Sequence, residues 1–261
     1  MIIAIANQKG GVGKTTTAVS LACGLAAEGR RVLLVDSDPQ GNASGSLGVN
    51  KNEVEFSLYD ALVDDKPVQE ITLDIGRQNL YLVPAKVELA GAEVELSALG
   101  HTNPEEQPAF RLRKILAEVR DNYDFILIDC PPTLGQLTIN ALSAADGVLI
   151  PIQCEYLALE GLTQLKNTID LVVNALNPKL QIFGIVMTMY DGRTNLAMQV
   201  VEEVKRYFPQ QIFNTVVPRS VRLSEAPSYG QSIFEYDPSS RGAQAYKALS
   251  KEVEQRAFAA A

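Results

Sequence analysis

The sequence predicts an α/β fold with a mostly parallel, twisted sheet and helices on both of its faces. Short apolar segments of strand length alternate with longer segments that repeat apolar residues at helical spacing, the pattern of parallel strands joined by crossover helices. The first apolar segment leads through a glycine-rich loop directly into a helical pattern. With 46% hydrophobic residues, the 261-residue chain can build one large core, so a single domain over residues 1–261 is expected.

The individual elements follow from these patterns in chain order. Apolar runs bounded by turn residues predict strands at 2–6, 31–35, 80–83, 125–128, 147–152 and 182–189. Helical spacing of apolar residues predicts helices at 16–28, 110–121, 157–176, 194–207 and 239–258. Gly29 is expected to end the first helix, and Asn177 with Pro178 the third. Residues 41–52 and 100–108 are rich in turn-forming residues and are expected to be surface loops.

Composition narrows the class of protein. The first apolar run lacks a basic leader, so no signal peptide is expected, and no apolar run reaches membrane-spanning length. Cys23, Cys130 and Cys154 form no C-x-x-C pair, which favours free thiols in the cytoplasm. The net charge of −8 argues against binding nucleic acid over the whole surface, so DNA contact needs a local basic patch. No helix-turn-helix domain is expected before the glycine-rich loop, which begins close to residue 1.

The glycine-rich loop is the strongest functional motif. It reads Lys9, Gly10, Gly11, Val12, Gly13, Lys14, Thr15 and Thr16. Between a strand and a helix, its backbone N–H groups and the helix N-terminus can bind phosphate oxygens. Lys14 supplies a cation to the β- and γ-phosphates, and the Thr15 hydroxyl suits Mg²⁺. The motif therefore predicts a site for ATP and Mg²⁺.

The start of this loop departs from the usual pattern. A glycine is expected six residues before Lys14, but the chain has Gln8, followed by Lys9. Two lysines so close together repel each other unless an anion neutralises both. Lys9 is therefore also expected to serve phosphate.

Aspartates follow two of the predicted strands. Asp36 and Asp38 come after residues 31–35, and Asp129 comes after 125–128. The carboxyl ends of strands in an open α/β sheet form the edge where ligands bind. Asp129 is typical of the carboxylate that holds Mg²⁺, often through water. With the glycine-rich loop, these aspartates complete the motif set of an ATP site.

These motifs resemble the deviant Walker-A family of P-loop ATPases, which includes the ParA/Soj partitioning proteins, MinD and the nitrogenase iron protein. The resemblance covers nearly the whole chain and is closest to the chromosomal ParA/Soj group. Beyond the phosphate loop, it is carried by residues 38–42, 155–161, 187–191 and 217–227.

The resemblance implies a P-loop NTPase fold and an ATPase that works as an ATP-bound homodimer. Lys9 would reach the nucleotide of the other subunit, and Asp38 would position or activate the attacking water, with Asp36 in support. Lys9, Lys14 and Asp38 are thus the expected catalytic residues. Mg²⁺ would be held by Thr15, Asp38 and Asp129, with the carboxylates acting through water.

The resemblance also assigns the outer contacts. Met189, Pro218 and Ser220 would line the adenine, although the family usually has Asn where this chain has Ser220. Arg193 and Arg222 match positions that the family uses for DNA contact. Neighbouring cations could enlarge that patch, namely Lys205, Arg206, Arg219 and Arg241. The implied partners are non-specific double-stranded DNA and a ParB-like protein that stimulates hydrolysis, in a cytoplasmic protein associated with the nucleoid.

Other relatives fit less well. MinD-like proteins end in a basic amphipathic helix that binds membranes, whereas residues 256–261 contain one aromatic residue and little charge. A metabolic P-loop kinase or synthetase would need an acceptor pocket that no motif identifies. DNA partitioning without membrane binding is the leading interpretation. A MinD-like spatial regulator or an ATPase that positions another cargo is the alternative, and a metabolic enzyme is less favoured.

Overall fold

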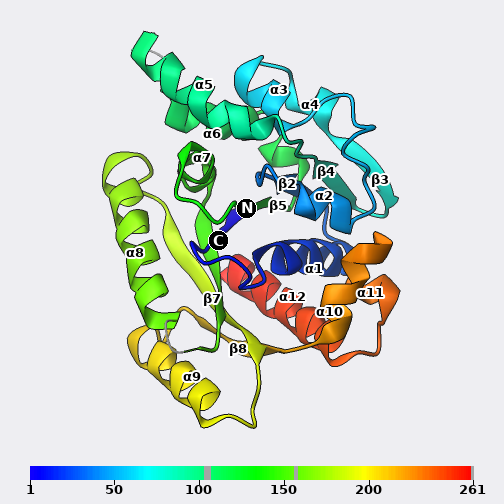
Figure 1. Cartoon of the computed structure of the whole chain (residues 1–261), viewed down its shortest axis with the longest axis vertical. Coiled ribbons are helices and arrows are strands. Elements are labelled where there is room, and N and C mark those ends of the chain that lie inside the picture. Colours follow the sequence, from blue (N-terminus) through cyan, green and yellow to red (C-terminus); the bar gives the residue numbers. More distant parts are fainter. Residues whose placement is uncertain (103–106, 156–157, 260–261) are drawn as a thin grey trace.

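The computed structural model describes residues 1–102, 107–155 and 158–259, and its strands form one sheet (Figure 1). The strand order is β3-β4-β2-β5-β1-β6-β7-β8. The pair β3–β4 is antiparallel, and the other neighbouring pairs in this sheet are parallel. The strands are β1 (Ile2–Ile5), β2 (Val32–Asp36), β3 (Leu73–Arg77), β4 (Leu80–Val83), β5 (Phe125–Asp129), β6 (Gly147–Gln153), β7 (Gln181–Tyr190) and β8 (Ile212–Pro218).

Helices cover both faces of this sheet (Figure 1). The α-helices are α1 (Lys14–Ala27), α2 (Asn42–Ser46), α3 (Leu58–Val63), α4 (Val68–Ile71), α5 (Leu89–Thr102), α6 (Arg111–Ala117), α7 (Gln136–Ala144), α8 (Ala158–Ala175), α9 (Asn195–Tyr207), α10 (Val221–Glu225), α11 (Ile233–Tyr236) and α12 (Arg241–Ala259). The described residues also form the single 3₁₀ turns η1 (Pro108–Phe110), η2 (Arg120–Asn122) and η3 (Ala226–Tyr229). No helix among the described residues is long and apolar enough to cross a membrane.

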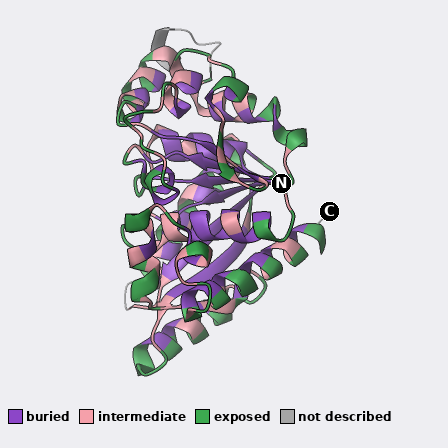
Figure 2. Ribbon diagram, turned by 90° about the vertical axis from the view of Figure 1, so that its right-hand side faces the viewer, coloured by how far each residue is buried: buried purple, intermediate pink, exposed green. Residues whose placement is uncertain are grey.

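The core consists of two apolar layers, one on each face of the sheet. Ile2 and Ala4 of β1 belong to the layer that includes residues of α5, α7 and α8. Ile3 and Ile5 belong to the layer beneath α1 and α12. Successive side chains of a strand point to opposite faces, so β1 must be apolar at every position when both faces are covered. Figure 2 shows the resulting buried interior, with exposed residues on the outer surfaces of the helices.

The six predicted strands and five predicted helices all occur, with shifted ends. Residues 110–121 divide into α6 and the turn η2, and the predicted helix over 157–176 is α8, although Leu157 lies outside the described residues. Gly29 follows α1 with φ 88°, as expected of a helix-ending glycine. The sequence patterns missed β3 and β8, the short helices α3, α4, α10 and α11, and the longer helices α5 and α7.

The loop prediction for residues 41–52 was wrong in part. Residues 42–46 form α2, and Ala43, Ser44 and Ser46 are buried. The short polar segment carries no helical apolar period, and its helix is fastened by Ser44, whose N–H and hydroxyl both donate to Asp36. The second predicted loop, residues 100–108, begins within α5, which continues to Thr102. Residues 103–106 lie outside the described residues.

Candidate nucleotide-binding site

The predicted site residues converge at the carboxyl ends of the central strands. β1 leads into the phosphate loop. β5 lies between β1 and β2, and Ile5 of β1 and Asp36 of β2 are both in register with Asp129 of β5. The two aspartates therefore lie at the same level of one sheet edge. This is the edge at which an open parallel sheet binds its ligand.

The phosphate loop has a backbone shape that requires glycine. Gly11 and Gly13 have φ of 75° and 88°, in the left-handed region that favours glycine. The Thr188 hydroxyl donates to the Val12 carbonyl oxygen at 2.8 Å, so β7 holds the loop from the side. Asn7 donates to the Pro151 carbonyl oxygen at 2.7 Å and accepts the Lys9 N–H at 3.0 Å, which fixes the start of the loop.

Lys14 lies inside the loop. Its side chain is buried, and Nζ donates to the Lys9 carbonyl oxygen at 3.2 Å. Burial lowers the pKa of Lys14, and the carboxyls of Asp129 and Asp38 oppose that change. The ammonium group is thus held within a largely dehydrated pocket, where an anionic phosphate interacts strongly with it.

Lys9 takes a different direction. Its ammonium group forms an ion pair with Glu155, which follows β6. The Lys9 side chain remains 44% exposed. The loop therefore holds one buried lysine, Lys14, and one partly exposed lysine, Lys9.

Asp129 has no hydrogen-bond partner for either carboxylate oxygen among the described residues, although the residue is fully buried. Burial raises its pKa well above the ordinary value, and the nearby Asp36 adds to this effect. The Thr15 hydroxyl and Lys14 oppose the rise. Buried polar atoms without partners are rare, and a hydrated Mg²⁺ beside Thr15 would supply the missing partner. The donor set fits the predicted ion.

Asp36 and Asp38 have different surroundings. Asp36 is fully buried and accepts the N–H and hydroxyl of Ser44 at 2.8 and 2.7 Å. Burial raises the pKa of Asp36 to about 6. Among the described residues, the Asp38 side chain accepts one hydrogen bond, from the Gln40 N–H at 2.9 Å. Asp36 therefore anchors α2, while the other oxygen of Asp38 is left for a ligand.

The residues expected at the adenine lie at the ends of β7 and β8. Tyr190 is in register with Pro218, and the Arg219 N–H donates to the Tyr190 carbonyl oxygen at 3.2 Å. Met189 has φ of 50°, which is uncommon for a residue other than glycine and marks local strain. Ser220 precedes α10 and makes no side-chain cap to that helix. Met189, Pro218 and Ser220 thus come from one edge of the fold.

The two arginines expected at DNA are both paired with carboxylates of the same chain. Arg193 is 89% exposed and donates to both oxygens of Asp191, at 2.8 and 2.6 Å. This contact lowers the pKa of Asp191 to about 2. Arg222 donates to Glu225 at 2.9 Å and lies 3.5 Å from Asp237. Surface ion pairs of this kind are weak, so neither guanidinium group is held firmly by its carboxylate.

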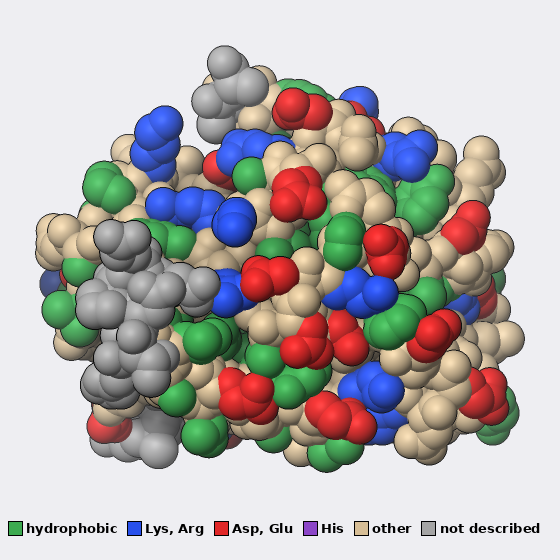
Figure 3. Space-filling view, turned by 90° about the horizontal axis from the view of Figure 1, so that it is seen from above, with side chains coloured by type: hydrophobic (Ala, Val, Ile, Leu, Met, Phe, Trp, Pro, Cys, Tyr) green, Lys and Arg blue, Asp and Glu red, His purple; other side chains and the backbone are tan. Residues whose placement is uncertain are grey.

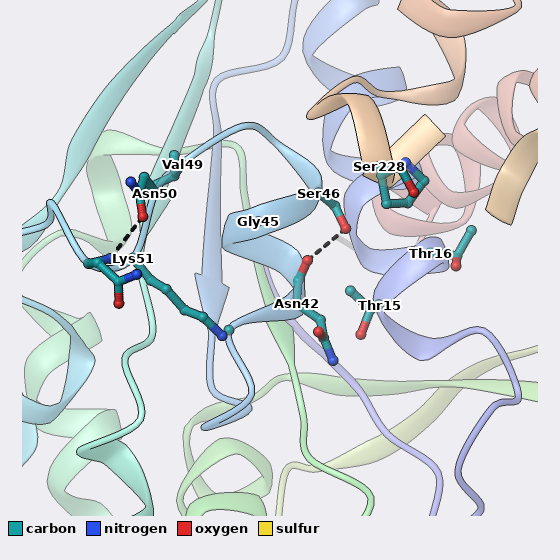
Figure 4. A pocket seen from close by; sticks show the side chains of 12 residues that line it. Thr15, Thr16, Asn42, Gly45, Ser46, Val49, Asn50, Lys51 and Ser228 are labelled. Atoms are coloured by element: carbon teal, nitrogen blue, oxygen red, sulfur yellow. Dashed lines mark hydrogen bonds between the residues drawn. The ribbon is translucent and has the colours of Figure 1, made fainter. Parts of the chain in front are cut away.

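A cavity of about 600 Å³ adjoins the phosphate loop. Figure 4 shows that Thr15 and Thr16 of α1, Ser46 of α2 and Ser228 of η3 gather around it. The sequence patterns did not identify the contributions of α2 and η3, because the two segments meet only in the folded chain. Among the described residues, no group of three or more His, Cys, Asp or Glu side chains could hold a metal ion by itself.

A parallel sheet with a glycine-rich phosphate loop after a central strand defines a P-loop nucleotide-binding protein. A family model described as "AAA domain" matches residues 1–182. The chain is 57% identical over 252 residues to the sporulation initiation inhibitor protein Soj of Bacillus subtilis, covering 97% of each chain. It is 54% identical over 255 residues to the chromosome partitioning protein ParA of Myxococcus xanthus, covering 98% of this chain and 88% of that protein.

The fold also matches solved structures over its full length. Cobyrinic acid a,c-diamide synthase from Mycobacterium smegmatis, with bound ADP and magnesium, superposes with a TM-score of 0.85 at 34% identity, covering 100% of this chain and 96% of that one. The curated relatives are the more similar in sequence. The chain belongs to the ParA/Soj family of chromosome-partitioning ATPases.

Proposed function

We propose that this protein is an Mg²⁺-dependent ATPase that dimerises on ATP and, as the dimer, binds double-stranded DNA without sequence preference. A ParB-like partner would stimulate hydrolysis and return the protein to the monomer. The protein would act in the cytoplasm on the nucleoid. The similarity to Soj and ParA over nearly the whole chain supports this proposal.

The different directions of the Lys9 and Lys14 side chains are the main observation that supports the proposed dimer. Lys14 is committed to the phosphate loop of its own chain. The Lys9 side chain is partly exposed, and in the described part of the chain its ammonium group has one partner, Glu155. A second subunit that brings an ATP phosphate to Lys9 would offer a multiply charged anion in place of one carboxylate. Dimerisation would then depend on the nucleotide.

The proposed ATP contacts follow from the geometry of the loop. The loop N–H groups of residues 10–16, together with Lys14, would bind the phosphates. Thr15 would hold Mg²⁺, with Asp129 and Asp38 acting through water. When bound, Mg²⁺ would neutralise charge on the β- and γ-phosphates. Asp38 has one uncommitted oxygen with which to orient the attacking water.

The proposed DNA contact is local because the chain is acidic overall. Figure 3 shows acidic and basic side chains mixed on the face that it displays, as expected for a net charge of −8. With Arg193 and Arg222, each monomer has only a small basic patch for DNA. The dimer would present two such patches. Linking two weak patches raises affinity through effective concentration. DNA binding should therefore require ATP.

The likeness to a diamide synthase does not favour a metabolic activity. That protein is 34% identical to this chain, whereas the two partitioning relatives exceed 50% over equal or nearly equal spans. None of the described side-chain groups in this chain points to an amide acceptor.

The test is DNA affinity in ATP, in ADP and without nucleotide, measured on two unrelated duplexes. We expect binding in ATP alone, with equal affinity for both duplexes. Equal binding in all three states would contradict the switch, and a strong preference for one duplex would indicate a site-specific reader.

A further inference from the structure

Two segments far apart in the sequence meet at one seam, formed by residues 47–48 after α2 and Gly230 after η3. Gly48 and Gly230 both have positive φ, of 80° and 62°. A Cβ atom placed on Gly230 would lie 2.7 Å from the Gly48 Cα. Real Cβ atoms do not approach so closely, so this backbone contact requires glycine at position 230.

Arg77 fastens this seam. From the edge strand β3, its Nη1 donates to the Leu47 carbonyl oxygen at 2.7 Å, and its Nη2 donates to the Gly230 carbonyl oxygen at 3.0 Å. The same guanidinium binds both carboxylate oxygens of Glu235, at 2.9 and 3.1 Å. This forked arrangement uses the fixed geometry that distinguishes arginine from lysine. β3, α2 and α11 lie on the same side of the molecule in Figure 1.

One side of the seam belongs to the nucleotide site. α2 begins at Asn42, four positions after Asp38, and Ser44 within it donates to Asp36 through both its N–H and its hydroxyl. The Ser44 hydroxyl also accepts the Ala85 N–H at 3.2 Å. A change at Asp36 on nucleotide binding would therefore act directly on α2 and the residues that follow it.

The other side of the seam belongs to the segment that carries Arg222. Arg222 donates to Glu225, and the Tyr236 hydroxyl donates to the same carboxylate at 3.1 Å. Tyr229 stacks on Tyr236 with ring centroids 5.2 Å apart. Glu235 accepts the Ser232 N–H at 2.7 Å, which ties the start of α11 to the Arg77 contact. Arg222 is thus linked to η3 and α11 through Glu225, Tyr236 and Tyr229.

We propose that Arg77 is a positioning residue that couples the nucleotide-dependent state of α2 to the DNA-contact segment carrying Arg222. The inference rests on the proposed function of the site. Arg77 touches neither nucleotide nor DNA in this scheme. It makes the position of η3 depend on α2, so that ATP and DNA each favour the same arrangement of the seam. Such coupling is reciprocal, so DNA should raise ATP affinity by the factor by which ATP raises DNA affinity.

The first experiment measures the ratio of the DNA dissociation constants in ADP and in ATP for wild type, Arg77→Ala and Arg77→Lys. We expect both variants to lower this ratio by about fivefold or more, within the usual range of coupling between sites. ATP affinity without DNA and the ATP-dependent dimer should stay unchanged. Arg30→Ala is the matched control, because Arg30 also forms an ion pair, with Glu254, but lies away from the seam. A wild-type ratio in both Arg77 variants would overturn the proposal.

A second readout needs no DNA. The chain contains no tryptophan, so Tyr229→Trp places a single tryptophan on η3, which can be excited selectively above the tyrosine absorption. We expect ATP with Mg²⁺ to change its emission, and Arg77→Ala to abolish that change. An ATP response that persists in Arg77→Ala would overturn the coupling. Wild-type DNA binding that is independent of ATP would contradict the proposed function alone. The fluorescence measurement would still test the coupling through Arg77.

Gly230→Ala tests the backbone contact while the Arg77 side chain is kept. The new methyl group must push η3 away from Gly48, so we expect the loss of coupling seen for Arg77→Ala. Gly29→Ala carries a similar positive-φ strain, but its methyl group would meet nothing within 4 Å. Thermal unfolding checks that each variant is folded at the assay temperature. Equal nucleotide coupling in the two glycine variants would contradict a role for the Gly48–Gly230 contact.

Discussion

The ammonium group of Lys14 donates to the backbone carbonyl of Lys9, while the Lys9 side chain leaves the loop to pair with Glu155. A buried cation, Lys14, and a partly exposed one, Lys9, thus lie five positions apart in the sequence. Burial would strengthen the proposed interaction of Lys14 with phosphate. Exposure leaves Lys9 available to a second molecule.

Lys14→Ala should lose most of its affinity for ATP. The variant removes the buried cation of the phosphate loop, and hydrogen bonds to charged groups contribute about 1.5–3 kcal/mol each. We expect ATP binding to weaken by roughly 10- to 100-fold, measured by calorimetry with Mg²⁺. Lys66→Ala is a control, because Lys66 pairs with Glu70 on the surface. ATP affinity near that of wild type would contradict the assignment of residues 9–16 as the phosphate-binding loop.

Gly10→Val should bind ATP as a monomer. A Cβ atom at Gly10 would meet nothing within 4 Å in its own chain, so the monomer can accept the side chain. The added bulk would instead stand between two subunits that close over their phosphate loops. We expect light scattering to show a monomer in ATP, and calorimetry to show normal ATP affinity. A normal dimer would count against a face-to-face interface at this loop.

Asp38→Ala should keep ATP binding and the dimer but hydrolyse slowly. Asp36, rather than Asp38, anchors α2, so the local fold should survive the substitution. Loss of a group that positions or activates water typically costs about 10²- to 10⁴-fold in rate. We would measure phosphate release and, by analytical ultracentrifugation, the persistence of the dimer. An unchanged hydrolysis rate would exclude this role.

Asp129→Asn should stabilise the nucleotide-free protein and reduce the stabilisation that Mg²⁺ and ATP provide on binding. The pKa of the Asp129 carboxyl is raised on folding, so the folded state holds its proton more tightly than the unfolded state. Stability from this group is therefore present at acid pH and is lost as pH rises above 3.8 through the raised pKa.

Thermal unfolding from pH 5 to pH 8 measures this effect. The Tm of Asp129→Asn should exceed that of wild type at the upper end, by about 2–4 °C for each kcal/mol gained. The Tm increase produced by Mg²⁺ and ATP should shrink. A variant less stable than wild type at pH 8 without nucleotide would show that the ionised carboxylate has a partner in the folded protein.

Arg193→Ala and Arg222→Ala should weaken DNA binding by the ATP dimer without changing ATP affinity. The contacts would be to phosphates, so each lost contact should reduce the slope of log affinity against log salt by about one. Arg120→Ala is a suitable control, because Arg120 forms a comparable half-exposed ion pair with Asp146. Wild-type affinity and slope in both variants, with the dimer intact, would overturn the patch assignment.

Much of the fold could be predicted because the central strands are recognisable locally. β1, β2, β5 and β6 are buried on both faces and read as continuous apolar runs. β3 could not be found in this way. Its exposure alternates between intermediate and exposed, and it pairs with β4 through an irregular antiparallel register. A weakly apolar edge strand gives little local signal.

The sequence by itself determined the phosphate loop and the family, because the loop is continuous and its glycines, lysines and threonine act on a ligand through neighbouring backbone groups. Only the tertiary structure decided which groups share an environment. The register of β1, β2 and β5 brings Asp36 beside Asp129. The fold also pairs Lys9 with Glu155, 146 residues away, and Arg77 with Glu235, 158 residues away. No local sequence pattern predicts such pairs, because their contact depends on the path of the whole chain between them.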